Sequence, residues 1–255
     1  LMVFIPLIIV GSTLAYYQVK KVLQISIEKE LHDTTDFLVN LIKTSASVSI
    51  KNRLHAIAEK NLDIAQYYYA KHGSGLLTKA EAVEIIEEIF LSQHIGISGY
   101  VYCLNSKGVV KVHPNDQMQD VDVSEYDFVK KQMKIKDGYI EYDWKNPGEK
   151  KERPKALYMV YFKPLDWIIS VSSYRDEFKY LVNINDFKES ILSYKSGKTG
   201  YAYVLDEDGT AIVHPKLQGI NLLEQPEYPN EFLNQIFKKK NGKIKYFWKN
   251  PGEAH

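Results

Sequence analysis

The chain contains two copies of one sequence pattern. Residues 99–114 read GYVYCLNSKGVVKVHP and residues 200–215 read GYAYVLDEDGTAIVHP, so these blocks lie 101 residues apart. A second pair of blocks follows in the same order, GYIEYDWKNPGE at 138–149 and GKIKYFWKNPGE at 242–253, at a spacing of 104 residues. Two ordered pairs of blocks this similar indicate a duplicated module. The chain is therefore expected to fold as two like units rather than as one large domain.

Each copy has the pattern of antiparallel strands joined by turns. The Gly-Tyr-x-Tyr-x-Leu run favours a strand, and the turns at 105–108 and 206–209 are of the type that joins hairpin strands. Each returning strand ends at His-Pro, because proline has no N–H for the strand ladder. A short helix at 126–134 follows in the first copy. The fold class predicted from this order is α+β, with about five antiparallel strands per module and helices on one side.

The second copy is expected to be incomplete. In the first copy, strands are predicted at 139–144, 156–162 and 167–173. The second copy reaches His255 before the counterparts of the last two strands.

The N-terminal residues predict a membrane anchor followed by a long helix. Residues 1–19 carry no charge and have about the length that crosses a bilayer. Residues 20–75 are rich in helix-forming residues, with no Pro or Gly before His72. A partial heptad pattern predicts that this segment is a stalk and the dimer contact of a homodimer. An uncleaved signal anchor or a buried core helix is the alternative for 1–19, and a long helix without dimerisation is the alternative for 20–75.

The repeated motif resembles a known family. The chain resembles the tandem Cache sensor domain of the Cache-2 type in three motifs. They are Gly-Tyr-x-Tyr-x-x-(Asn/Asp)-x-x-Gly-x-x-x-x-His-Pro, then Trp-x-Asn-Pro, then Lys155-x-x-Tyr158-x-x-x-Phe162 with Trp167. The sequence departs from the family at 170–174, which reads SVSSY in place of a Gly-rich end. The resemblance implies two PAS-like modules, a membrane-distal one at 76–178 and a membrane-proximal one at 179–255.

The resemblance implies that the chain is a sensor of small molecules. Such domains lie in the periplasm or outside the cell, on chemoreceptors and sensor histidine kinases of the inner membrane, and bind small molecules, mostly short carboxylates. A kinase or methyl-accepting part would lie beyond residue 255, and the sensor region itself is not expected to be an enzyme. A ligand-free dimerisation ectodomain and an extracytoplasmic hydrolase are the alternatives.

A pocket for a small carboxylate needs cationic or hydroxyl donors among apolar walls. His113 and Lys155 supply the cationic donors, and Tyr158 is preferred to Tyr161 because it matches the family pattern. In the first module the candidates are Tyr100, Tyr102, His113, Trp144, Lys155, Tyr158 and Tyr161. Their counterparts in the second module are Tyr201, Tyr203, His214 and Trp248. Each of these can also be explained as a core or turn residue. The first module is the favoured binding module.

Composition and charge argue against several other classes of function. With a net charge of +1, the chain has no overall field of one sign that would point to nucleic acid. A single cysteine, Cys103, can form neither an internal disulfide nor a multi-cysteine zinc site. The Asp206-Glu-Asp-Gly run is weakly similar to a calcium loop, but a turn is the preferred interpretation. No cofactor and no metal are predicted.

Overall fold

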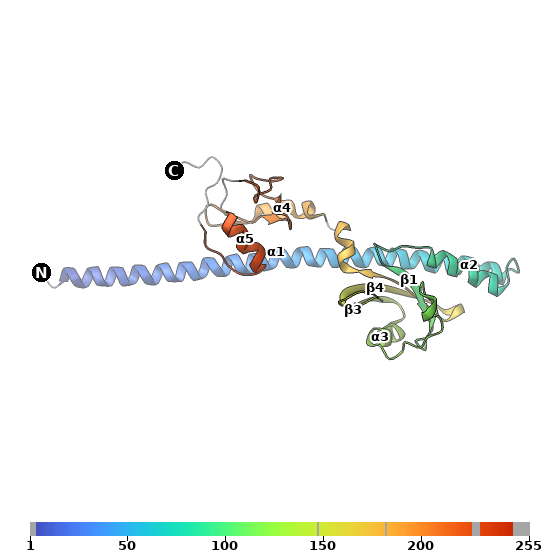
Figure 1. The fold of residues 1–255 in the computed structure, drawn as a ribbon. Helices are drawn as coiled ribbons and strands as arrows, with labels where there is room; N and C mark the ends of the chain where they lie inside the picture. The colour runs from blue at the N-terminus through green and yellow to red at the C-terminus, as the bar shows by residue number, and fades with distance from the viewer. Residues whose placement is uncertain (1–3, 147, 182, 226–229, 247–255) are drawn as a thin grey trace. The chain divides into compact units, whose positions relative to one another are not determined.

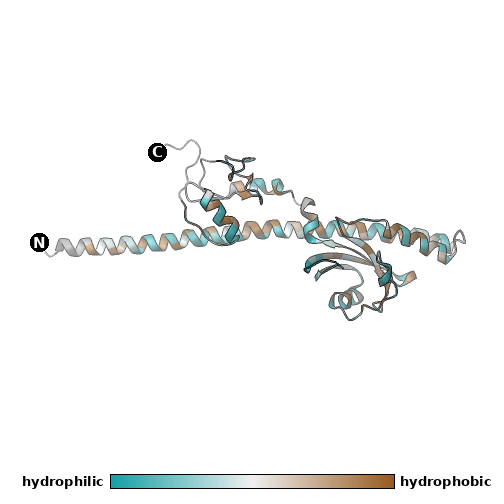
Figure 2. Cartoon of the chain, viewed as in Figure 1, coloured by the Kyte–Doolittle hydropathy of each residue, from teal (hydrophilic) through white to brown (hydrophobic). Residues whose placement is uncertain are grey.

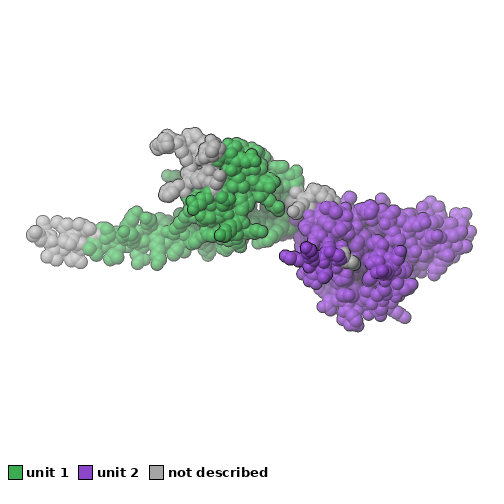
Figure 3. Space-filling view, viewed as in Figure 1, with its two compact units in different colours: residues 1–43, 183–255 green, residues 44–182 purple. Residues whose placement is uncertain are grey.

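The chain divides into two compact units in the computed structural model, which describes residues 4–146, 148–181, 183–225 and 230–246. Unit 2 comprises residues 44–182, and unit 1 comprises residues 1–43 together with 183–255 (Figure 3). The first copy of the repeated pattern lies in unit 2 and the second copy lies in unit 1. Each copy therefore belongs to its own folded body.

The N-terminal region is one helix, α1 (Phe4–Gly73), as predicted for 20–75 and with a further extension toward the N-terminus. Its residues up to Lys43 belong to unit 1, and those from Thr44 belong to unit 2. Hydrophobic and hydrophilic residues are interspersed along α1 (Figure 2). Within the described residues, no helix combines the length and the hydropathy that a bilayer crossing requires. The predicted anchor at 1–19 begins with three residues outside the described part.

Unit 2 is built on one antiparallel sheet of five strands, in the order β2-β1-β5-β4-β3. The strands are β1 (Tyr100–Leu104), β2 (Val110–Val112), β3 (Gly138–Trp144), β4 (Arg153–Phe162) and β5 (Trp167–Tyr174). These agree with the strands predicted for the first copy. The last strand in sequence, β5, lies in the middle, where it pairs with both β1 and β4.

One face of this sheet packs on helices. The part of α1 that follows Ile50 and helix α2 (Lys79–Leu91) bury their apolar residues against Val101, Cys103 and Val171. Helix α2 begins at a capping box, as its sequence predicts: the Thr78 side chain accepts from the backbone N–H of Glu81, and the Glu81 carboxylate accepts in return. The opposite face carries helix α3 (Asp127–Ile135), and Figure 1 shows the sheet between α3 and α1.

Gly99 lies where the backbone of β1 enters the sheet close to neighbouring backbone atoms. A Cβ atom at Gly99 would lie 2.3 Å from the carbonyl oxygen of Ile95 and 2.4 Å from that of Ser172. No side chain fits in that space, so Gly99, the first residue of the repeated motif, is required by the close approach of β1 to β5. The corresponding Gly200 has the same crowding, with the carbonyl oxygen of Ser196 at 2.5 Å.

Short 3-10 helices complete unit 2 and lead out of it. They are η1 (Asp116–Met118), η2 (Lys163–Leu165) and η3 (Arg175–Leu181). Unit 1 continues with η4 (Ile184–Phe187), α4 (Lys188–Ser193), β6 (Lys195–Ser196), β7 (Gly200–Tyr201), β8 (Val204–Leu205), β9 (Ala211–Val213) and α5 (Asn230–Lys239).

Unit 1 has a less regular sheet than its sequence predicts. Its described strands form two separate pairs, β6 with β7 and β8 with β9, and residues 244–246, which correspond to part of β3, are not in a strand. In unit 2 the central strand is β5, and no counterpart of β5 is among the described residues of unit 1. A small core around Leu217, Leu222 and Leu233 holds this unit together.

Candidate functional site

A small cavity lies between the sheet of unit 2 and helix α3. Its volume is about 50 Å³, which is enough for a few waters or a very small organic molecule. Its walls are mostly aromatic and aliphatic. They are formed by Tyr100, Tyr102, Leu104, Val110, His113, Met118, Val123, Tyr126, Phe128, Val129, Tyr142 and Trp144. Four of the predicted residues, Tyr100, Tyr102, His113 and Trp144, are therefore brought together around one cavity.

Lys155 lies buried beside this cavity. Only 1% of its surface is exposed, and its Nζ has no hydrogen-bond partner among the described residues. The Nζ lies 4.3 Å from the ring centre of Tyr100 and 5.3 Å from that of Tyr174. Burial lowers the pKa of Lys155 to about 8, against the weaker opposing effect of Glu149 and Glu177. A buried ammonium without a hydrogen-bond partner can donate charge-assisted hydrogen bonds to an anion.

A second buried donor faces the same side of the sheet. The Ser172 Oγ also has no hydrogen-bond partner among the described residues. Ser172 is paired with Tyr100 on β1 and with Leu157 on β4, so its side chain shares the face of Tyr100 and Lys155. Sequence reasoning did not single out Ser172, because an alternating strand pattern does not reveal which serine lacks a partner.

His113 is held in one tautomer when it is neutral. Its Nδ1 accepts a hydrogen bond from the backbone N–H of Asn115 at 3.0 Å, which leaves the proton on Nε2. Burial is the main cause that lowers its pKa, and the charge of Lys155 lowers it further. Its ring contacts Tyr100 edge-on at 5.0 Å between centres. Neutral His113 can thus donate a hydrogen bond from Nε2.

The hydroxyl of Tyr102 is tied to a buried amide. Gln132 on α3 is fully buried, and its Nε2 donates to the Tyr102 hydroxyl at 2.9 Å. Its Oε1 accepts from Ser170 Oγ on β5 at 2.8 Å. Gln132 thereby links α3 to two neighbouring strands beside the cavity. No sequence pattern indicated Gln132, since the amphipathic pattern of α3 predicts an apolar residue at such a position.

The aromatic wall is completed by residues of α3 and β3. Phe128 stacks on Tyr142 with ring centres 4.2 Å apart and the rings nearly parallel, and Trp144 contacts Phe128 edge-on at 5.3 Å. Burial raises the pKa of Tyr142 far above its ordinary value, so its hydroxyl stays protonated and can donate. The repeat itself could have indicated Tyr142, because the second copy has Tyr246 at the same place.

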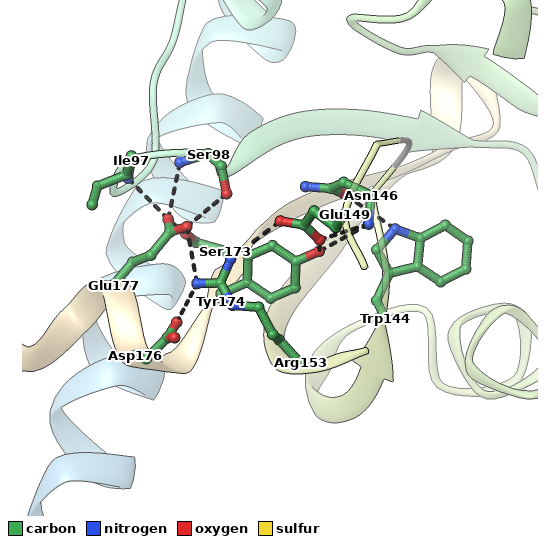
Figure 4. A network of polar contacts seen from close by, with 10 residues as sticks. All are labelled: Ile97, Ser98, Trp144, Asn146, Glu149, Arg153, Ser173, Tyr174, Asp176 and Glu177. Atoms are coloured by element: carbon green, nitrogen blue, oxygen red, sulfur yellow. Dashed lines mark hydrogen bonds and ion pairs between the residues drawn. The ribbon is translucent and has the colours of Figure 1, made fainter. Parts of the chain in front are cut away.

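The loop between β3 and β4 is fixed by a polar network, shown in Figure 4. The Trp144 indole N–H donates to Asn146 Oδ1 at 3.2 Å, so Trp144 contributes a wall to the cavity rather than a free donor. The Asn146 backbone N–H donates to the hydroxyl of Tyr174 and to Glu149, and the Tyr174 hydroxyl donates to Glu149. Arg153 lies over the Tyr174 ring, with 3.9 Å between the guanidinium carbon and the ring centre.

Two predicted tyrosines lie away from the cavity, and the preference for Tyr158 was wrong. Tyr158 is on the helix-covered face of the sheet, where its ring contacts His55 at 4.3 Å. The reason is the period of two: Lys155 and Tyr158 are three residues apart on one strand and point to opposite faces. Tyr161 shares the face of Lys155, but its hydroxyl donates to Asp166 at 2.8 Å and it does not line the cavity.

The second copy repeats the aromatic arrangement in a smaller space. Tyr201, Tyr203 and His214 surround a cavity of about 10 Å³, which also contacts Phe232 and Tyr246. His214 Nδ1 accepts from the backbone N–H groups of Lys216 and Leu217, as His113 does from Asn115. Trp248 lies outside the described residues.

Two other predictions can be checked against side-chain surroundings. Asp206 Oδ1 accepts from the backbone N–H groups of Asp208 and Thr210, so its carboxylate belongs to the turn that the sequence predicted. Cys103 is fully buried, and burial raises the pKa of its thiol. It therefore behaves as a small core residue.

Comparison with known proteins assigns the family. A family model described as a Cache domain, of the dCache_2 type, matches residues 17–255. The chain therefore belongs to the Cache family, as the repeated motif indicated. No curated protein matches the chain significantly.

Solved structures of similar fold cover about half of the chain. A periplasmic sensor domain of a chemotaxis protein is 20% identical, with a TM-score of 0.45 over 50% of this chain and 96% of that chain. A Cache chemosensory domain described for its recognition of carboxylic acid is 19% identical, with a TM-score of 0.44 over 48% of this chain and 91% of that chain. A methyl-accepting chemotaxis protein from Vibrio parahaemolyticus is 15% identical, with a TM-score of 0.46 over 56% and 99%.

Proposed function

We propose that this chain is the extracytoplasmic ligand-binding region of a transmembrane signal-transduction protein, and that its ligand is a short organic carboxylate. Membership of the Cache family supports the sensing role. The observation that carries the ligand class is Lys155, a fully buried ammonium with no hydrogen-bond partner among the described residues. A buried unpaired cation is unfavourable in a folded protein. A bound carboxylate would neutralise it and accept its hydrogen bonds.

The copy in unit 2 is the proposed binding module. Its cavity of about 50 Å³ is larger than the cavity of about 10 Å³ in unit 1. Its lysine and its free serine hydroxyl lie on β4 and β5, and no counterparts of these two strands are among the described residues of unit 1. The second copy is proposed to act in transmission of the signal rather than in binding.

The first part of α1 is proposed to pair with the same helix of a second copy, beside a membrane anchor at 1–19. Large hydrophobic side chains along this part are exposed in the single chain, among them Leu23, Ile27 and Leu31. Exposed apolar residues in such a continuous run favour burial against a partner. Ligand binding in unit 2 would then shift α1 slightly and bias the output inside the cell.

Thermal unfolding of the chain with single small solutes tests the ligand class. Acetate, propionate and L-lactate are expected to raise the unfolding temperature, and propionamide, the uncharged analogue of propionate, is not. At a concentration of about 100 times Kd, binding adds roughly 2.7 kcal/mol to the free energy of unfolding. The double variant His113→Ala with Lys155→Ala should lose the effect. If no carboxylate stabilises the wild-type chain, the proposed function is wrong.

A further inference from the structure

The end of helix α5 and the turn after it carry a cluster of exposed lysines. The helix ends at Lys239, and the next residue has the left-handed backbone conformation that closes it, with φ 57°. Five lysines lie within residues 238–245, all of them exposed, and no acidic residue lies between them. These five form the lysine cluster: Lys238, Lys239, Lys240, Lys243 and Lys245. This segment is strongly positive, although the net charge of the whole chain is only +1.

The first copy has no such cluster at the same place. The spacing of 104 residues aligns residues 238–245 with 134–141, and the two helices end alike, each followed by a lysine with a positive φ. The two lysines of 134–141 are balanced there by Asp137 and Glu141. In the second copy an asparagine and a lysine stand at those two positions. The structure that the two copies share therefore does not explain the lysine cluster.

Most of the cluster is unpaired within the part of the chain that the structure describes. Lys243 Nζ donates to the carboxylate of Glu28 on α1 at 2.5 Å, and Lys239 Nζ donates to the backbone carbonyl of Lys243 at 3.4 Å. The remaining three lysines make no hydrogen bond and no ion pair there, although the charge of Lys245 also acts on Glu28. One carboxylate thus pairs with one of the five ammonium groups. The others are available to an anionic partner.

The lysine cluster lies beside the turns of α1 that include the end of the proposed anchor. Lys243 and Lys245 belong to one wall of a groove of about 570 Å³. The other wall is α1 from Tyr16 to Leu31, which includes Lys20. Both walls belong to unit 1. A bilayer that holds the proposed anchor would therefore end at this level of α1, with Lys20 at its surface and the lysine cluster next to it.

Resting on the membrane anchor of the proposed function, we propose that the lysine cluster of unit 1 docks on an anionic lipid surface, that of the bilayer in which the anchor sits. Clustered lysines are attracted to the phosphates of anionic lipids, and salt weakens this attraction. An acidic protein segment has the same charge complementarity, but the place of the cluster beside the anchor favours the lipid surface. The docked cluster is a second attachment of unit 1 to the membrane.

Acetylation of lysines by a water-soluble reagent, read by mass spectrometry, tests this contact residue by residue. The full chain is compared on vesicles of phosphatidylcholine alone and on vesicles that also contain anionic phosphatidylglycerol, both at low salt. With the anionic vesicles, the unpaired lysines of the cluster are expected to react at least about fivefold more slowly. A salt concentration of about 0.5 M should remove this protection, because it screens the charges. Exposed lysines of unit 2 should react equally with both kinds of vesicle.

Two triple variants test whether the lysines themselves cause the contact. The first replaces the unpaired lysines of the cluster: Lys238→Gln, Lys240→Gln and Lys245→Gln. Lys239 remains as the reporter, and its protection by anionic vesicles should fall below about half of the wild-type value. The control removes three exposed lysines of unit 2 and should keep the protection of Lys239: Lys107→Gln, Lys131→Gln and Lys134→Gln. Thermal unfolding checks that both variants fold, and the wild-type measurement stands if either does not.

The outcomes separate this inference from the proposed function. Protection of the cluster by neither kind of vesicle, or equally by both, overturns the inference, as does protection of Lys239 that persists in the cluster variant. Protection by soluble polyglutamate but not by anionic vesicles also overturns it, in favour of an acidic protein partner. Carboxylate binding, measured without lipid, is unaffected by these results. A chain that does not float with neutral vesicles contradicts the anchor, whereas protection by anionic vesicles alone still supports the docking of the cluster.

Discussion

At the scale of single residues, burial of Lys155 is unfavourable for the folding stability of the protein but would favour the proposed binding of a carboxylate. Burial removes its ammonium from water without giving it a hydrogen-bond partner among the described residues. Two aromatic rings, Tyr100 and Tyr174, offset part of that unfavourable energy. We therefore expect the lysine to destabilise the protein without a ligand, and the proposed carboxylate to offset that effect.

Replacement of Lys155 by methionine is expected to stabilise the empty protein at pH 7, by about 1–3 kcal/mol in urea unfolding. The same variant should lose binding of carboxylates. The folded pKa of Lys155 is about 8, below the ordinary lysine value of 10.5. The unfolded chain thus holds more protons between these pH values, and this group makes the wild-type protein more stable as the pH rises from 8 to 10.5. The variant should lack that rise.

Lys107 provides the matched control, because it is an exposed lysine in the first hairpin turn. Lys107→Met should leave both stability and binding nearly unchanged. A Lys155→Met protein that is less stable than wild type at pH 7 would show that the ammonium is stabilised in the empty state, against the interpretation given above.

At the scale of elements, the start of β1 and the segment after β5 are joined by one carboxylate. Glu177 on η3 accepts from the backbone N–H groups of Ile97 and Ser98, each at 2.9 Å, and from the hydroxyl of Ser98 at 2.6 Å. It also accepts from Ser173 Oγ at 2.7 Å. Figure 4 shows these contacts converging on Glu177 beside Arg153. The end of β5 is thereby fixed to the loop that enters β1.

The pKa of Glu177 is lowered: burial alone would raise it, but the hydrogen bonds from Ser98, Ser173 and Ile97 outweigh that effect. Its contribution to stability is therefore present above pH 4.5 and is lost as the pH falls through the lowered folded value. Glu177→Gln is expected to reduce the free energy of unfolding by about 2–3 kcal/mol at pH 7, because an amide N–H would face backbone N–H groups.

Urea unfolding at several pH values measures this effect. The difference between Glu177→Gln and wild type should shrink below pH 4.5, where the carboxylate is protonated first in the unfolded chain and, at lower pH, in the folded protein. Glu125→Gln, at a side chain that is 96% exposed, should change little at any pH. A difference for Glu177→Gln that stays constant from pH 7 to pH 3 would contradict the role of the charge.

At the scale of the whole molecule, the two copies of the repeated pattern lie in two units that differ in structure. Both keep a histidine whose Nδ1 accepts from the backbone two residues later. Unit 2 adds a five-stranded sheet, the buried lysine and the buried amide. Unit 1 has two short strand pairs and an isoleucine at the position of the amide. The repeated pattern thus occurs once with the buried lysine and the buried amide, and once without them among the described residues.

Amide hydrogen exchange with and without L-lactate tests this division. Slower exchange is expected in α3 and in the strands β1, β4 and β5, because the ligand stabilises the unit that holds it. Residues 195–246 should show little change. Lys155→Met with the same concentration of L-lactate is the control and should show no protection. Equal protection in both units would mean that the second copy also binds.

Much of this arrangement could be predicted from sequence because it depends on local patterns. The repeated blocks indicated two modules, the strands of the first copy were predicted to within a few residues, and Thr78 with Glu81 correctly indicated the start of α2. Tyr158 was misplaced because family resemblance was given more weight than the period of two along β4. Gln132 and Ser172 were missed because only their partners across the sheet distinguish them from other helix and strand residues.

The sequence by itself determined the duplication, the antiparallel strands, their turns and the family. The tertiary structure decided that β5 lies between β1 and β4. This placement brings Ser170 opposite Tyr102 and Ser172 opposite Tyr100. The tertiary structure also decided which face of the sheet is covered by α1 and which is left for α3 and the cavity. The physical reason is that alternation along a strand specifies which side chains share a face, while the packing of distant segments determines what that face meets.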